Sequence, residues 1–157
     1  MRFLHKKASM LLETLTTLFD RDLNRVRTEL RQYRDEQQIW AVPAGISNSA
    51  GNLCLHLIGN LNTYIGAELG QSGYVRQREL EFSLRDVPRP VLLTQLEDTI
   101  AIVTRTLTTL DAASLDEEYP LQVFEKKTST GYLLMHLATH LSYHLGQMNY
   151  HRRLVEG

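Results

Sequence analysis

Apolar residues recur at three- and four-residue steps along four stretches of the chain, with polar residues between them. This spacing is that of an α-helix with one buried face. The apolar positions of the first stretch are Leu4, Ala8, Leu11, Leu12, Leu15, Leu18, Phe19, Leu23, Val26, Leu30 and Tyr33. They predict an amphipathic helix of about eight turns that ends before Trp40.

The second and third helices are bounded by capping and helix-breaking residues. We expect the second to open at Ser47 or Asn48, because either side chain can cap the free N–H groups of a first turn. It should stop around residues 70–73, where glycine recurs. The third should start near Pro88 or Pro90, since proline is tolerated in the first turn of a helix.

The fourth helix is predicted from Tyr132 to about Val155, with Thr128 or Ser129 as its capping residue. Between the second and third helices, residues 74–82 alternate imperfectly between polar and apolar and are expected to be extended. Four amphipathic helices without a convincing sheet predict an all-α fold, a four-helix bundle. No linker or repeat divides the chain, so residues 1–157 should form a single domain.

Charge and composition exclude several classes of protein. The 157 residues carry 17 basic and 18 acidic side chains, whereas dedicated nucleic-acid binders usually have a basic excess. The single cysteine, Cys54, cannot form an internal disulfide. The amino-terminal apolar run is too short for a signal peptide, and no stretch is long enough for a membrane span. We therefore expect a cytoplasmic protein that binds neither nucleic acid nor membrane.

The histidines are the most informative residues. His136, His140 and His144 follow one another at four-residue steps in the fourth helix. Each step rotates the side chain by about 40° and climbs about 6 Å, so neighbouring imidazoles can share one ion. The outer two are about 12 Å apart along the axis. Either His136/His140 or His140/His144 could therefore be the pair, and the latter lies on the apolar face, which points it into the core.

A third imidazole, that of His56 in the second helix, is also predicted to face inward. Together with the pair it would make a three-histidine set that leaves a coordination position open, as in catalytic metal sites. The alternative is a buried histidine that only hydrogen-bonds to a carbonyl group. We interpret His5, His136 and His151 as solvent-facing, orienting or packing residues. Cys54 is nearly opposite His56 on the helical wheel, so we exclude it as a ligand.

Three segments resemble the DinB/YfiT-like superfamily of metalloenzymes. Residues 136–147 are similar to its carboxy-terminal H-x-x-x-H motif followed by Gly-Gln, residues 52–61 to its helix-two segment, and residues 76–82 to a stretch of one subgroup. The resemblance implies up-down-down-up connectivity, frequently a homodimer, and a divalent metal. It also implies that the metal ligands are His56, His140 and His144. Leu145 stands where many members carry an arginine.

The metal should be zinc or nickel, although imidazole also suits iron and copper. Because such an ion lowers the pKa of a bound thiol or water, two enzymatic functions follow. The resemblance favours a transferase that activates a low-molecular-weight thiol cofactor toward a small-molecule substrate. Hydrolysis by metal-activated water is one alternative. The other is a bundle without catalytic activity that binds metal or dimerises.

Polar residues near the predicted site could assist the chemistry. Asn60 and Gln147 are candidates for orienting the ligands or contacting the substrate. Tyr64 and Tyr143 could donate protons, although inward tyrosines more often only pack. A final cluster comprises Arg76, Arg78, Glu79 and Glu81. It could clamp an anion, but we favour an exposed set of ion pairs.

Overall fold

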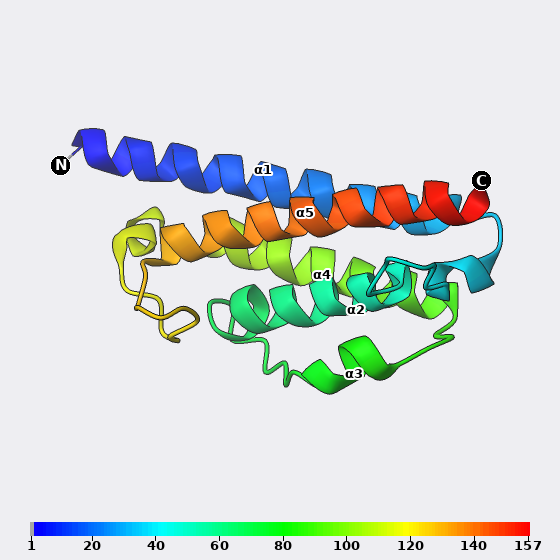
Figure 1. Cartoon of the computed structure of the whole chain (residues 1–157). Helices are drawn as coiled ribbons and strands as arrows, with labels where there is room; N and C mark the ends of the chain where they lie inside the picture. The colour runs from blue at the N-terminus through cyan, green and yellow to red at the C-terminus, as the bar shows by residue number, and fades with distance from the viewer. Residues whose placement is uncertain (1) are drawn as a thin grey trace.

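The computed structural model describes the backbone of residues 2–157 and the side chains of residues 7–157. Within this part the chain forms five α-helices and no strand (Figure 1). The helices are α1 (Arg2–Gln32), α2 (Ala50–Leu61), α3 (Arg78–Ser83), α4 (Arg89–Thr109) and α5 (Thr130–Glu156). Short helical turns lie at Glu36–Trp40, Asn62–Ala67 and Ala112–Asp116. The predicted all-α fold is confirmed.

The four longer helices pack on one another around a common apolar core. α1 contacts α4 and α5, and α2 contacts the same two helices from the other side. In Figure 1, α1 and α5 run in one direction, and α2 and α4 run in the opposite one. The core therefore lies between helices that are far apart in the sequence, and it brings α2 and α5 together.

The apolar stripe of the first predicted helix forms the buried face of α1. Leu15, Phe19, Leu23, Val26 and Leu30 of this stripe are all buried. Their three- and four-residue spacing keeps them on one side of the helix, while the residues between them are exposed or half-buried, apart from buried Asp22. The hydrophobic pattern thus predicted the orientation of α1.

α2 begins one or two residues later than expected. Its cap is Ser49, neither Ser47 nor Asn48, because the Ser49 side chain accepts a hydrogen bond from the Asn52 backbone N–H. Every residue of α2 is buried, so a wheel with one inward face describes it poorly. The helix continues as a π-helical turn, Asn62–Ala67, a distortion frequently found at functional sites.

The segment expected to be extended, residues 74–82, is partly helical. Its second half belongs to α3, which packs against α2. The side-chain amide of Asn52 donates hydrogen bonds to the carbonyl oxygens of Glu81 and Leu84, both at 3.0 Å. This contact occupies carbonyl groups at the end of α3 and fixes the short helix on α2. Such a long-range contact is absent from the local pattern, which is why the prediction was wrong.

The remaining helices begin close to their predicted starts. α4 has Pro88 as its N-cap and carries Pro90 in its first turn. Ser129 caps α5 by accepting a hydrogen bond from the Tyr132 N–H at 3.2 Å. No helix in residues 2–157 is both long and apolar enough to cross a membrane. The predicted homodimer and the cytoplasmic location stay predictions.

Candidate metal centre

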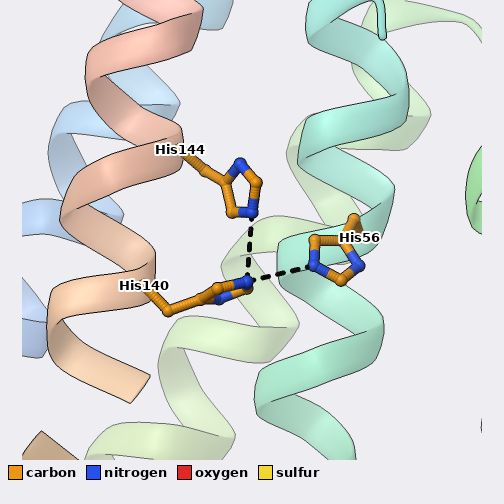
Figure 2. A group of neighbouring side chains, drawn as sticks. All are labelled: His56, His140 and His144. Carbon is orange, nitrogen blue, oxygen red and sulfur yellow. Dashed lines mark hydrogen bonds between the residues drawn. The ribbon is translucent and has the colours of Figure 1, made fainter. Parts of the chain in front are cut away.

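Three imidazole rings, one from α2 and two from α5, meet between these helices (Figure 2). His140 Nε2 lies 3.3 Å from His56 Nε2 and 3.0 Å from His144 Nε2. One ring nitrogen of each residue lies within 4.8 Å of those of the other two. The structure therefore brings together the three histidines that the sequence singled out.

These separations fit a shared metal ion. Two nitrogens that each lie about 2.0–2.1 Å from one ion are about 3.3–3.4 Å apart at the tetrahedral angle and about 2.9 Å apart at a right angle. The separations of 3.3 and 3.0 Å fall in this range. The three-histidine group could therefore hold a divalent ion.

The structure also shows which two histidines of α5 belong to the three-histidine group, namely His140 and His144. His144 turns toward His56, whereas His136 is exposed and stacks on His140 with ring centroids 6.1 Å apart. The pair lies less deep than predicted, because His140 and His144 are half-buried while His56 is 8% exposed. The site is therefore at the edge of the core, where a small molecule can approach it.

The far nitrogen of His56 is held by a buried carboxylate. His56 Nδ1 donates a hydrogen bond to Glu81 Oε2 at 3.0 Å. Arg76 donates to both oxygens of the same carboxylate, at 2.7 and 2.9 Å. Burial alone would raise the pKa of Glu81, but the hydrogen bonds from His56 and Arg76 lower it overall. Glu81 is therefore ionised at neutral pH and orients His56 as carboxylates do for metal-bound histidines.

This geometry corrects the expectation of an exposed ion-pair cluster. Glu81 is only 5% exposed, and Arg76 is half-buried beside it. Arg78 and Glu79 are exposed, as expected. The prediction failed for Arg76 and Glu81 because α3 turns the Glu81 side chain toward α2, whereas an extended strand would have left it in solvent.

A glycine of α2 makes room for the carboxylate. A methyl group at Gly59 would overlap Glu81 Oε1. Gly59 lies three residues after His56 and so on the same side of the helix. Its missing side chain lets the carboxylate approach α2 closely enough to reach the imidazole.

His144 has a partner on its own helix. Its Nδ1 donates a hydrogen bond to Gln147 Oε1 at 2.6 Å, and Gln147 Nε2 donates to the hydroxyl of Tyr143 at 3.2 Å. Gln147 and Tyr143 are exposed, so this chain runs along the surface of α5. It fixes the ring of His144 with Nε2 directed at the other two imidazoles.

These outer contacts determine which nitrogens carry protons. In neutral His56 and His144, donation from Nδ1 leaves the lone pair on Nε2. Both lone pairs then point at His140 Nε2, which can donate at most one proton between them. A cation at the meeting point would satisfy all three nitrogens.

His140 has one ring nitrogen without a partner in the described part of the chain. Its Nδ1 is buried and has no hydrogen-bond partner among the described residues. Burial first, and then the neighbouring histidines His144, His56 and His136 and the charge of Arg76, lower its pKa to about 4. The pKa of His144 is also lowered, mainly by burial. Both rings are thus neutral at pH 7, the form that binds metals.

A cleft of about 200 Å³ lies beside His56 and His140. Asn60, Tyr64 and Arg76 line its inner part, and the exposed side chains of Arg78 and His136 stand at its rim. Asn60 and Tyr64 come from the end of α2 and the π-helical turn that follows it. The cleft gives a small molecule access to one side of the three-histidine group.

The other residues considered from the sequence lie apart from this group. His151 is buried, where its Nδ1 lies 2.7 Å from the Tyr33 hydroxyl and its Nε2 contacts the Ala41 carbonyl oxygen at 2.8 Å. Cys54 is buried, and burial raises the pKa of its thiol to about 12. The side chain of His5 lies outside the described residues. Sequence reasoning missed the role of Glu81, for which the only signal was an acidic residue in the segment after helix two.

A model of one protein family matches residues 6–157, nearly the whole chain. The family is described as "Protein of unknown function (DUF1572)". No curated protein matches the chain at a significant level.

Proposed function

The chain belongs to the DUF1572 family, and we propose that it is a metal-dependent enzyme whose ligands are His56, His140 and His144. The observation that carries this proposal is the convergence of three Nε2 atoms at 3.0 and 3.3 Å. Neutral imidazoles suit zinc and nickel, the ions that we expect.

Three protein ligands beside a cleft support a catalytic role over a structural one. Structural zinc sites are closed by four protein ligands, whereas catalytic sites keep a position for water or substrate. When bound here, the ion would lower the pKa of a thiol or water that occupies this position. The cleft beside His56 and His140 provides the access that such a ligand needs.

The lining of the cleft favours thiol activation over hydrolysis. No carboxylate among the described residues lines the cleft, where it could act as a base for water. The nearby carboxylate of Glu81 already accepts hydrogen bonds from His56 and Arg76. A thiol has an ordinary pKa of about 8.5, far below the pKa of water, and so needs less help to lose its proton. In the proposed transfer the thiol releases its proton to solvent and its sulfur forms a bond to an electrophilic atom of the substrate. The bond from that atom to the leaving group breaks, and the leaving group departs with its electron pair.

We extend the proposal to the fold and the superfamily. The similarity of residues 52–61 and 136–147 to the DinB/YfiT-like motifs is supported by the meeting of His56 with His140 and His144. The directions of α1, α2, α4 and α5 in Figure 1 agree with an up-down-down-up four-helix bundle. We therefore propose DinB/YfiT-like ancestry for this chain.

A screen of small electrophiles with the metal-loaded protein tests the activity. Each electrophile is incubated with and without a low-molecular-weight thiol, and loss of the electrophile is followed against the His140→Ala variant. The proposal expects turnover that requires both the thiol and His140. Turnover without thiol would instead assign hydrolysis, and equal rates for the variant would contradict a catalytic role of the site.

A further inference from the structure

The cleft beside the three histidines carries an excess of positive charge. Two arginines line it, and Arg76 is neutralised by its two hydrogen bonds to Glu81. Arg78 is different, because no carboxylate within the described residues forms an ion pair with it. An unpaired guanidinium beside a metal site favours an anionic ligand.

A second unsatisfied group lies deeper in the same cleft. Asn60 is 8% exposed, and its Oδ1 is buried with no hydrogen-bond partner in the part of the chain that the structure describes. Asn60 lies four residues after His56, on the same face of α2. An unpaired buried acceptor costs free energy. Asn60 lines the cleft, so a turn of its side-chain amide toward the cleft would let a ligand N–H or O–H group satisfy Oδ1.

From these two groups we propose that the cleft is a subsite for a small carboxylate that also carries a hydrogen-bond donor. Its carboxylate pairs with Arg78, whose planar guanidinium matches the two oxygens. Its N–H or O–H group donates to Asn60 Oδ1, and its reactive atom faces the histidines. The inference rests on the proposed function, and it adds the chemical class of the ligand.

Small thiols that differ by one group test this subsite in the cobalt-loaded protein. The probes are L-cysteine, 3-mercaptopropionate without the amine, and cysteamine without the carboxylate, and absorption by a thiolate–cobalt bond reports binding. L-Cysteine should bind tightest. Arg78→Gln should weaken the binding of L-cysteine and of 3-mercaptopropionate about tenfold, and it should leave the binding of cysteamine unchanged. Arg105→Gln, which removes an exposed charge on α4, is the matched control and should change nothing.

The role of Asn60 is tested by comparing L-cysteine with 3-mercaptopropionate, which lacks the amine. Asn60→Leu should remove the advantage of L-cysteine over 3-mercaptopropionate, about fivefold to tenfold, while helix content and cobalt stoichiometry stay normal. If this variant does not fold, Asn60→Ser keeps an acceptor in a smaller side chain and should retain part of the advantage. Preservation of the full advantage in a folded Asn60→Leu protein would overturn the assignment of Asn60.

A thiol-free arm separates this inference from the proposed function. Lactate carries a carboxylate and a hydroxyl, and propane-1,2-diol has the same skeleton without the charge. If lactate alone shifts the cobalt spectrum in an Arg78-dependent way and no thiol binds, the subsite is supported and thiol activation fails. If thiols with and without a carboxylate bind equally well, and Arg78→Gln does not change their binding, thiol activation is supported and the subsite is overturned.

Discussion

Glu81 Oε2 accepts a hydrogen bond from His56 Nδ1 at 3.0 Å, although 25 positions separate the two residues in the chain. The contact joins α3 to the three-histidine group and leaves the Nε2 lone pair of His56 free for a metal. It also makes the geometry of the candidate metal site dependent on α3, a helix that contributes none of the three histidines.

Loss of this carboxylate should weaken metal binding without removing a ligand. We expect Glu81→Gln to reduce zinc affinity about 10- to 100-fold, the usual effect of losing the partner of a metal-binding histidine. Competition with a chromophoric chelator measures this change. Glu79→Gln alters an exposed neighbour and should bind zinc like the unmodified protein. Equal affinity in the Glu81 variant would show that this carboxylate does not tune the site.

A methyl group at Gly59 should disrupt the same hydrogen bond between His56 and Glu81, here by displacing the carboxylate. Because it would overlap Glu81 Oε1, Gly59→Ala should displace the carboxylate and lower metal affinity to a similar extent. Gly146→Ala is a control on α5, where a Cβ meets no atom within 4 Å. That variant should be at least as stable as the parent, since alanine is favoured over glycine inside helices. Undiminished zinc affinity in Gly59→Ala would contradict the close packing described here.

Much of the site follows from the period of the α-helix. The four-residue spacing of His140 and His144 and the inward setting of His56 predicted the residues that meet. The contact with Glu81 could not be predicted this way, because it depends on the Asn52 amide that fixes α3 and on the space above Gly59. The half-buried position of the α5 pair likewise depends on packing between helices, which local periodicity does not describe.

The stability of the metal-free protein should fall in mild acid. His140 has a pKa of about 4 in the folded protein, against an ordinary 6.5, so the unfolded chain binds the proton more readily. The contribution of neutral His140 is therefore complete above pH 6.5 and is lost progressively as the pH falls toward 4. Denaturant unfolding across this range measures the effect. His140→Gln should flatten this part of the profile, and His136→Gln should leave it largely unchanged; the reverse result would contradict the assignment.

Gln147 should matter less than Glu81. It accepts from His144 Nδ1, but it is neutral and exposed, so its hydrogen bond is weaker than one to a buried carboxylate. We expect Gln147→Leu to lower zinc affinity by less than tenfold, measured by the same chelator competition. A loss larger than that of Glu81→Gln would reverse the order of importance proposed for the two outer contacts.

Elemental analysis of the protein, purified without a metal-binding tag and then exposed to zinc and desalted, tests the central claim most directly. One ion per chain is expected for the unmodified protein. His140→Ala, which removes the ligand shared by both short contacts, should retain almost none while keeping its helical circular dichroism. A folded His140→Ala protein with the same metal content as the parent would contradict a metal site at these three histidines.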